Sequence, residues 1–248
     1  VDISGNASVV VADLEPSREP IRAAQAEWAA RVREAARDAG ERIESLLAAG
    51  SGRTMLDLAR AVAASTSGPL VLGASNPVRA FDLAVPTLEG RVVHSNRGQA
   101  GIDGTIATAV GICLGSGYAG ETSAPAGERI TAVLGDLTAC HYASSLALAA
   151  SVGAHLDIVV ADDGGGGIFA TLEHGRAASL DAYDRWFGVA QAVNYEALAA
   201  AYGVAFARTD EPQELESLLD RPASGPRLIH APIERAAHLY AAIREIVN

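Results

Sequence analysis

Short apolar runs alternate with longer Ala- and Leu-rich stretches along most of the chain. From residue 54 onward the short runs have the length and β-branched content of strands, and the longer stretches have helical spacing. We predict strands at 69–73, 91–95, 129–134, 156–161, 204–207 and 227–231. We predict helices at 54–65, 77–84, 103–116, 138–150, 194–202, 211–219 and 236–246. Because the strands are apolar on both faces, the predicted fold class is α/β, a doubly wound parallel sheet with helices on both faces.

The first fifty residues have a different pattern. Residues 7–12 are strand-like, and 17–49 form a long Ala-, Glu- and Arg-rich stretch with helical spacing of apolar residues such as Trp28 and Val32. The sequence begins at Val1 and not at Met, and the apolar run follows almost at once. We therefore expect the chain to begin inside a longer polypeptide.

Composition excludes some classes of function. The formal net charge is −11 and the pI is near 4.9, which argues against a nucleic-acid backbone as partner. Neither an apolar run long enough for a membrane span nor a signal peptide is recognisable, so we expect a cytoplasmic protein. Cys113 and Cys140 lie in apolar runs without metal-binding spacing and are expected to be free thiols.

Acidic residues follow two consecutive predicted strands. Gly135-Asp136-Leu137-Thr138 follows the strand at 129–134, and Asp162-Asp163 with four glycines follows the strand at 156–161. If the two strands are neighbours in a parallel sheet, their terminal carboxylates converge to within about 5–10 Å. Thr138 is expected to cap the helix that follows.

Carboxylates repel a bare diphosphate, so a phosphate ligand here requires a divalent cation such as Mg²⁺ between them. The glycines allow positive φ and a close approach of the main chain to ion and phosphates. Free N–H groups at the start of the helix at 138–150 would add an anion site. The alternative is that Asp136 only caps a helix and that 162–167 is only a flexible turn. For either segment alone that alternative stays open; the two together favour the site.

This pattern resembles the thiamine-diphosphate signature of the decarboxylase and acetolactate-synthase superfamily. The resemblance implies three metal ligands, namely the carboxylates of Asp136 and Asp163 and the main-chain carbonyl of Gly165. It also implies that Gly135, Leu137, Thr138 and Gly166 contact the cofactor. The superfamily usually has Asn-Asn where this chain has Asp162-Asp163. An acidic ligand remains suitable for Mg²⁺ or Mn²⁺.

A narrower resemblance covers residues 54–247. It rests on Gly73-Ala74-Ser75-Asn76-Pro77-Val78-Arg79, His94-Ser95-Asn96-Arg97-Gly98-x-x-Gly101-Ile102-Asp103-Gly104, Gly135-Asp136-Leu137-Thr138 and Gly165-Gly166-Gly167-Ile168-Phe169. These runs are similar to the menaquinone-pathway family of 2-succinyl-5-enolpyruvyl-6-hydroxy-3-cyclohexene-1-carboxylate synthases. The family's reaction decarboxylates 2-oxoglutarate on thiamine diphosphate and transfers the succinyl group to isochorismate. The chain is thus expected to belong to a transferase of the carboligase type.

The resemblance gives roles to further residues. Both substrates are carboxylates, and guanidinium groups bind carboxylates bidentately, so Arg79 and Arg97 are expected to bind them, with Ser75 as a nearby donor. The alternative is that each Arg is a surface residue paired to Asp82 or Asp103. Three apolar side chains are expected to support the cofactor and line its pocket, although core packing is equally compatible: Ile102, Ile168 and Phe169.

Some expected parts are missing. The Glu that activates the cofactor in these enzymes lies in a separate pyrimidine-binding domain, usually of a partner subunit, and nothing in this chain resembles that domain. Residues 1–50 are expected to be the end of a middle domain and a connecting helix, and 51–248 the diphosphate- and Mg-binding domain. The whole enzyme is expected to be a homodimer or homotetramer, and this chain alone inactive.

Other functions remain open. The chain could come from another thiamine-diphosphate carboligase or decarboxylase, or be a non-catalytic α/β assembly module. A literal dinucleotide fingerprint at 115–120 follows a helix and precedes a loop, whereas that motif requires a strand and then a helix, so we reject it. His141-Tyr142 stands where the family often has an Asp, which leaves the surroundings of that helix uncertain.

Overall fold

The computed structural model describes residues 23–88, 90–99, 101–117, 129–172, 175 and 180–247. The predicted strand at 7–12 and most of the glycine-rich loop at 115–127 lie outside the described residues. The chain folds as two units, Val1–Gly40 and Glu41–Asn248. In the first unit the described residues belong to helix α2 (Ala23–Ala48), which confirms the predicted helix over that range.

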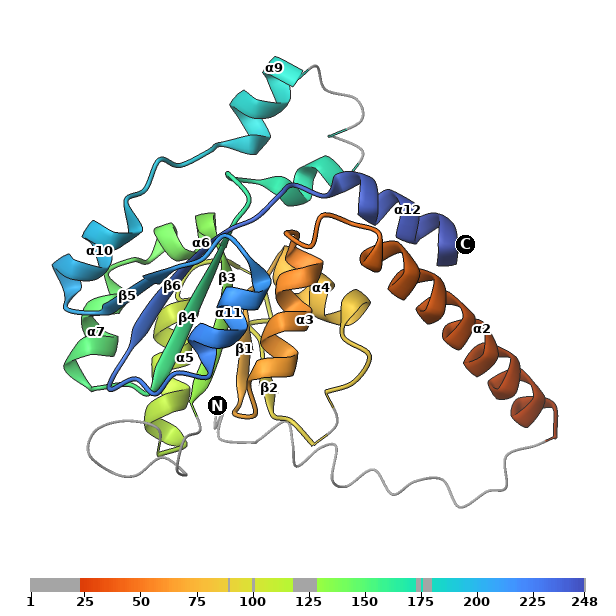
Figure 1. Ribbon diagram of the computed structural model, residues 1–248, viewed down its shortest axis with the longest axis horizontal. Coiled ribbons are helices and arrows are strands. Elements are labelled where there is room, and N and C mark those ends of the chain that lie inside the picture. Colours follow the sequence, from red (N-terminus) through yellow and green to blue (C-terminus); the bar gives the residue numbers. More distant parts are fainter. Residues whose placement is uncertain are drawn as a thin grey trace. The chain divides into compact units, whose positions relative to one another are not determined.

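The second unit is built on one sheet of six parallel strands, shown in Figure 1. The strands are β1 (Leu70–Leu72), β2 (Val93–His94), β3 (Ile130–Gly135), β4 (Leu156–Asp162), β5 (Ala205–Arg208) and β6 (Arg227–Pro232). Their order across the sheet is β2-β1-β3-β4-β6-β5. Every predicted strand from residue 69 onward is present, and the parallel class is confirmed.

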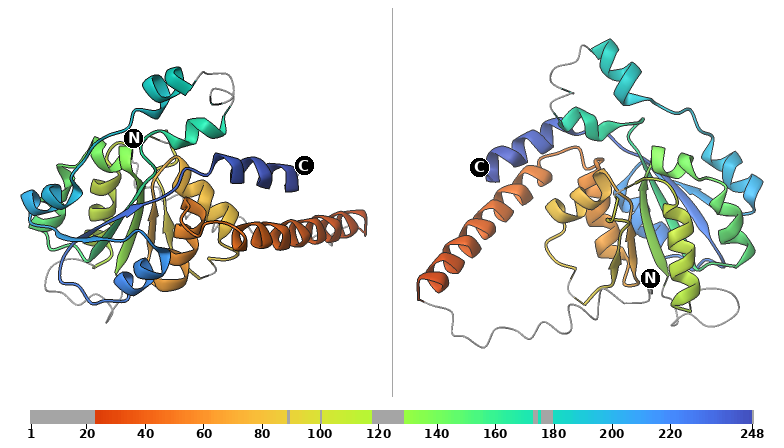
Figure 2. Two further views of the ribbon diagram at one scale, coloured as in Figure 1. Left: turned by 45° about the horizontal axis from the view of Figure 1, so that its top comes forward. Right: turned by 180° about the vertical axis from the view of Figure 1, so that it is seen from behind.

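Helices cover both faces of this sheet, as the two views of Figure 2 show. One face packs against α3 (Met55–Ser65), α4 (Asn76–Ala84), α11 (Pro212–Leu219) and α12 (Ala237–Val247). The other packs against α5 (Thr105–Gly115), α6 (Asp136–His141), α7 (Ser145–Ser151) and α10 (Tyr195–Tyr202). Among the described residues no helix is both long and apolar enough to span a bilayer.

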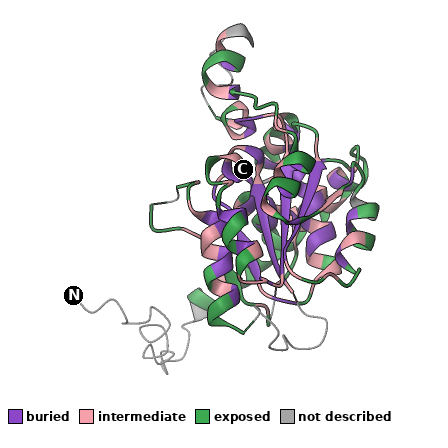
Figure 3. Ribbon diagram, turned by 90° about the vertical axis from the view of Figure 1, so that its left-hand side faces the viewer, coloured by how far each residue is buried: buried purple, intermediate pink, exposed green. Residues whose placement is uncertain are grey.

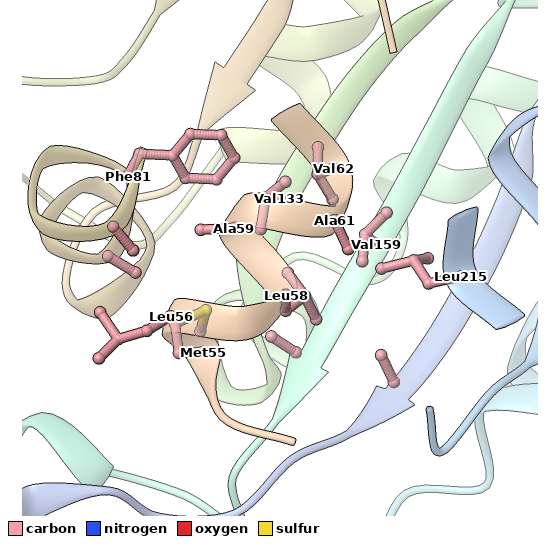
Figure 4. Close-up of a cluster of buried hydrophobic side chains, with 14 of the residues drawn as sticks. Met55, Leu56, Leu58, Ala59, Ala61, Val62, Phe81, Val133, Val159 and Leu215 are labelled. Carbon is pink, nitrogen blue, oxygen red and sulfur yellow. The ribbon is translucent and has the colours of Figure 1, made fainter. Parts of the chain in front are cut away.

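The core consists of two apolar layers separated by the sheet. Successive side chains of a strand point to opposite faces, so Val133 joins one layer and Leu134 the other. Figure 4 shows α3 in the first layer, where Leu58 and Val62 lie near strand residues Val133 and Val159. The four inner strands are buried almost throughout, whereas the edge strands β2 and β5 are partly exposed (Figure 3). A rigid, dry sheet therefore fixes the positions of the loops that follow its strands.

The predicted helix at 138–150 is wrong in two respects. It is divided into α6 and α7 by a turn at 142–144, because Tyr142 leaves the helical region with φ −135° and ψ 45°. The helix also begins at Asp136, directly after Gly135. Thr138 is therefore inside the first helical turn and buried, so it does not cap the helix as predicted. Leu137 N–H donates to the Asp136 carboxylate at 2.8 Å, so this N–H of the first turn has a partner within the helix.

The strand order creates a crevice at one edge of the sheet. From β1 the chain moves outward through α4 to the edge strand β2, and α5 then returns it to β3 on the other side of β1. Helix α4 covers one face and α6 the other. The loops after β1 and β3 therefore diverge, and open α/β sheets bind ligands at such a switch point.

Three shorter elements follow β4, in a region whose sequence is less periodic. They are a 3₁₀ turn (Gly167–Thr171), helix α9 (Leu180–Tyr183) and a π-helical turn (Asp184–Gly188). The π turn contacts the glycine-rich loop that ends β4, since Gly166 N–H donates to the Gly188 carbonyl at 2.6 Å. This segment therefore belongs to the crevice at the carboxyl edge.

Candidate functional site

A cavity of about 140 Å³ lies at this switch point. It is bounded by the start of α3 and by the loops after β1, β2, β3 and β4. Eleven of the thirteen predicted site residues line it: Ser75, Ile102, Gly135, Asp136, Leu137, Thr138, Asp163, Gly165, Gly166, Ile168 and Phe169. Residues predicted from separate stretches of sequence thus converge on one cavity.

Asp136 carries the least satisfied charge in this cavity. Its side chain is 3% exposed, and one carboxylate oxygen accepts the Leu137 N–H. The other oxygen, Oδ2, is buried and has no hydrogen-bond partner. Burial, and then the nearby charges of Asp163 and Asp162, raise the pKa of Asp136 from 3.8 to about 7. A cation placed against Oδ2 would remove this penalty.

Asp163 faces Asp136 from the loop after β4. Burial raises its pKa to about 6, and the nearby Arg235 guanidinium is the largest of the influences that oppose this rise. Gly167 N–H and the side chain of Asn76 also lie close enough to Asp163 to help lower its pKa. A Cβ at position 167 would lie 2.0 Å from the Asp163 carboxylate, so a larger residue there would displace this carboxylate. Two carboxylates with raised pKa values in one small cavity suit a divalent cation.

Asp162 does not line this cavity. Its Oδ2 lies 2.8 Å from Nε2 of His230, on β6, and its Oδ1 accepts Gly164 N–H at 3.0 Å. The hydrogen bond with His230 is the main cause of a lowered pKa of Asp162. The first acidic residue of the pair thus has a protein partner, which leaves Asp163 as the member that lines the cavity.

The glycine-rich loop is held from outside by the protein. Gly164 and Gly165 have φ of +75° and +121°, and a Cβ at Gly165 would lie 1.9 Å from the Gly188 carbonyl oxygen. Arg235 donates to the carbonyls of Asp163, at 2.7 Å, and Gly164. The Tyr183 hydroxyl donates to the Gly166 carbonyl at 2.9 Å. Three of the four carbonyls in this run thus accept from side chains outside the cavity, whereas the Gly165 carbonyl accepts the backbone Gly167 N–H at 3.0 Å.

The loop after β1 is strained. Ser75 has φ 78° and ψ −131°, which L-residues rarely adopt, and strain of this kind gathers at functional sites. The next residue, Asn76, begins α4, is 9% exposed and has a buried side-chain oxygen without a partner. The strained turn therefore directs a second unpaired oxygen into the region of the cavity.

Arg79 and Arg97 do not line the cavity. Both are exposed, and Arg79 donates to the Ser75 carbonyl at 2.7 Å. No ion pair joins Arg79 to Asp82, or Arg97 to Asp103, all of which belong to the described part of the chain. The alternative of surface pairs with these two aspartates is therefore not observed.

The predicted metal site contains few charged side chains. Among the described residues there is no group of three or more His, Cys, Asp or Glu side chains placed to hold one ion. The predicted set takes two ligands from carboxylates and one from a carbonyl. A larger groove of about 630 Å³ lies beside α3 and α11, and the arginine that lines it, Arg60, is paired at 2.7 Å with Glu44, which lies outside the groove. The smaller cavity has unpaired acceptors and is the better candidate.

Three contributors to the site were not predicted. Asn76 belongs to the run 73–79 that carries the resemblance, but sequence reasoning assigned it no role. The strained conformation of its neighbour Ser75 is a property of the backbone and cannot be seen in the sequence. His230 and Arg235 come from β6 and the loop after it. They reach the site because β6 lies beside β4 in the sheet, although 70 residues separate Asp157 from its β6 partner Arg227 (227 minus 157).

A comparison with protein families agrees with this geometry. Residues 80–231 match the model of the thiamine pyrophosphate enzyme C-terminal TPP-binding domain, which is more than half of the chain. The chain belongs to this family. Its cofactor is therefore thiamine pyrophosphate, also called thiamine diphosphate. The family domain includes β3, β4 and the loops that form the cavity.

Curated relatives of this TPP-binding domain share one name. A Nocardioides sp. protein is 41% identical over 84% of this chain, and one from Mycobacterium leprae is 38% identical over 98%. Both are named 2-succinyl-5-enolpyruvyl-6-hydroxy-3-cyclohexene-1-carboxylate synthase. The matched region covers 38% and 44% of their lengths, so the chain spans about two fifths of these relatives.

Solved structures support the fold of the TPP-binding domain. A thiamine diphosphate-dependent 4-hydroxybenzoylformate decarboxylase from Rhodococcus jostii superposes with a TM-score of 0.61 over 76% of this chain and 34% of its own. A benzoylformate decarboxylase from Polynucleobacter necessarius gives 0.56 over 73% of this chain and 33% of its own. The sequences are 17% identical in both cases, so the likeness shows the fold alone.

Proposed function

We propose that the chain is the C-terminal, cofactor-binding part of a 2-succinyl-5-enolpyruvyl-6-hydroxy-3-cyclohexene-1-carboxylate synthase of menaquinone biosynthesis. The observation that carries this proposal is the cavity at the switch point, in which the unpaired Oδ2 of Asp136 faces the loop of Asp163. The relatives at 38–42% identity support the choice of enzyme within the family. The whole enzyme would decarboxylate 2-oxoglutarate and transfer the succinyl group to isochorismate.

The metal and diphosphate are assigned to the acidic part of the cavity. Asp136, Asp163 and the Gly165 carbonyl would hold Mg²⁺ or Mn²⁺, which prefer oxygen ligands. The ion would offset the like charges that raise both carboxyl pKa values. The diphosphate would contact four residues around the ion: Gly135, Leu137, Thr138 and Gly166.

The cofactor rings are assigned to the apolar part of the cavity. Ile102 and Ile168 are half-buried at its wall, and Phe169 is 37% exposed at its mouth. When bound there, thiamine diphosphate would supply an electron sink for the decarboxylation. The side chains around it exclude water and fix its orientation.

The carboxylates of the substrates are assigned to Arg79 and Arg97. Both guanidinium groups are exposed, and Arg79 is tied to Ser75, a residue that lines the cavity, by its hydrogen bond to the Ser75 carbonyl. An exposed guanidinium group can bind a carboxylate with two parallel hydrogen bonds. Ser75 would donate a further hydrogen bond.

The cavity is too small for the whole cofactor. Its 140 Å³ is well below the roughly 300–1,000 Å³ of a typical small-molecule pocket. We therefore propose that a pyrimidine-binding domain of a partner subunit covers the rest of the cofactor, in a cytoplasmic homodimer or homotetramer. In this proposal residues 1–50 are the end of a middle domain with its connecting helix, residues 51–248 are the diphosphate domain, and this chain alone is inactive.

Calorimetric titration tests the cofactor site. The chain should bind thiamine diphosphate in the presence of Mg²⁺ and much more weakly with a chelator. Asp136→Ala should lose the Mg²⁺-dependent component. An Asp210→Ala variant is the matched control, because Asp210 is exposed, is paired to Arg208 and does not line the cavity, and it should bind as the parent does. Equal binding by Asp136→Ala and the parent would show the metal assignment to be wrong.

Product analysis tests the reaction. The chain joined to the missing domains should form the succinylated product from 2-oxoglutarate and isochorismate. Arg79→Gln and Arg97→Gln should raise the KM for a carboxylate substrate, because an exposed binding contact is lost. Turnover of another 2-oxo acid with no use of isochorismate would favour a different carboligase or decarboxylase. No metal-dependent cofactor binding at all would favour an assembly module.

A further inference from the structure

The side-chain amide of Asn76 lies beside Asp163 and is buried with an unpaired oxygen. The side chain is close enough to Asp163 to help lower the pKa of that carboxyl, and because a carboxylate only accepts, the amide nitrogen of Asn76 is the group that can donate to it. The amide oxygen Oδ1 is buried and has no partner. The residue is 9% exposed and lines the cavity, so its unpaired oxygen belongs to the wall of the site.

A second unpaired acceptor lies in the same cavity. Oδ2 of Asp136 is also buried without a partner, and it comes from α6, on the opposite face of the sheet from α4. Buried acceptors without donors oppose folding, so each requires an explanation. One species that offers positive charge and several donors would satisfy both, and a hydrated divalent cation is such a species.

The backbone holds Asn76 in this position. Ser75 is kept at φ 78° and ψ −131°, and Arg79 donates to its carbonyl at 2.7 Å. Pro77 follows within the first turn of α4 and fixes its own φ. An unfavourable conformation beside an unpaired side chain is typical of a position kept for a ligand and not for packing.

We propose that Asn76 is a positioning residue of the cation site. Its amide nitrogen holds the Asp163 carboxylate in place, and its Oδ1 accepts a hydrogen bond from a water molecule bound to the cation. The inference rests on the proposed function, because it requires the cation held by Asp136 and Asp163. It adds Asn76, from the loop after β1, as a residue that binds a metal-bound water. The metal signature covers only the loops after β3 and β4 and does not include this residue.

Titration of the full chain with Mn²⁺, in the presence of thiamine diphosphate, tests this proposal. Outer-shell partners of metal ligands typically contribute about 10- to 100-fold in metal affinity, so Asn76→Ala should raise the Mn²⁺ Kd by about that factor. Asn194→Ala is the matched control. Asn194 caps α10 by accepting Ala197 N–H, so its loss should lower the melting temperature and leave the Mn²⁺ Kd unchanged. If Asn76→Ala does not fold, Asn76→Leu, which nearly preserves the volume, should show the same weakening.

A conservative variant separates positioning from mere packing. Asn76→Asp keeps an oxygen toward the cation but loses the donor to Asp163, so it should melt lower without metal and recover parental Mn²⁺ affinity or exceed it. Binding by Asn76→Ala at the parental Kd, or by Asn76→Asp as weakly as Asn76→Ala, would overturn the proposal. If the parent binds no Mn²⁺, or if Asp136→Ala binds as the parent does, the proposed function itself fails.

Discussion

Asp136 places a carboxylate where the fold provides a donor for only one of its oxygens. The free energy cost of this arrangement depends on pH in a definite direction. Burial holds the pKa of the folded-state carboxyl at about 7, above its ordinary value of 3.8. Folding therefore takes up a proton in that window, and metal-free stability falls as pH rises from about 4 to 7.

This dependence predicts the behaviour of Asp136→Asn. Without divalent cations the variant should be more stable than the parent at pH 8, by on the order of 2 kcal/mol, because it removes the buried charge. The gain should shrink toward pH 5, where the parental carboxyl is protonated. Urea unfolding of the variant and the parent, with a chelator, measures the stability gain at pH 5 and at pH 8. A gain that is the same at pH 5 and pH 8 would contradict this account.

Gly165 gives a second prediction at the scale of single residues. An added Cβ would meet the Gly188 carbonyl at 1.9 Å, and φ is +121°, so Gly165→Ala should destabilise the chain by more than about 2 kcal/mol. Gly111→Ala makes the same change inside α5, where a Cβ meets nothing within 4 Å. The control should be neutral, or stabilising by about 0.5–1 kcal/mol. Chemical unfolding compares the two, and equal effects would show that the clash is not decisive.

Sequence reasoning reached the residues that occur in motifs. Asp136, Asp163 and Gly165 were predicted because their spacing follows the strands, and the structure places all three at the cavity. Their roles as metal ligands remain predictions. Asn76 and Arg235 were missed, because their contributions depend on side-chain directions and on a neighbouring strand that come from tertiary structure.

At the scale of elements, helix α3 shows how local chemistry fixes a boundary. Thr54 accepts Asp57 N–H, and the Asp57 carboxylate accepts Thr54 N–H at 2.9 Å, which forms a capping box. Thr54→Ala should therefore cost about 1–2 kcal/mol of stability. Asn194→Ala, which removes a single cap from α10, should cost about 0.5–1 kcal/mol. Thermal unfolding ranks them, and a larger loss for Asn194→Ala would contradict the argument.

Element boundaries were predicted well where a cap or an apolar run is strong. The strands lie within one or two residues of their predicted limits. The exception is the helix predicted at 138–150, because apolar spacing continues through a turn that only the backbone angles at Tyr142 reveal. Apolar periodicity reports which face is buried, and it does not report whether the helical hydrogen bonds continue.

At the scale of the whole molecule, a buried ionic cluster joins three strands at the amino edge, opposite the cavity. Asp157 accepts from Arg129 at 2.9 Å and from Arg227 at 2.8 Å, and all three side chains are at most 10% exposed. Asp157→Asn would leave two buried guanidinium groups without a counter-charge. It should cost about 3–5 kcal/mol.

The matched control for this prediction is Asp210→Asn. Asp210 and Arg208 form a pair at 3.0 Å whose side chains are about half exposed, and such surface pairs contribute about 0–1 kcal/mol. Urea unfolding of the two variants should show the difference directly. Equal losses would show that burial does not decide the strength of the cluster.

Strand order is the part of the whole molecule that the sequence did not reveal. Alternating elements predicted a parallel sheet with two covered faces, and this is confirmed. The insertion of β6 between β4 and β5 was not predicted, because apolar strands of similar composition offer no local signal for their neighbours. That insertion brings His230 and Arg235 to the loop after β4.

The two unpaired oxygens of the cavity also have a consequence for the lifetime of the protein. If the proposed cation and cofactor occupy this cavity, their absence would leave the buried acceptors of Asp136 and Asn76 unpaired and lower the stability of the folded state, and their binding would restore it. Proteases remove proteins in proportion to their unfolded fraction, so a loss of one or two kcal/mol changes abundance several-fold. Thiamine supply would then set how much of the enzyme a cell retains, as well as how much of it is active.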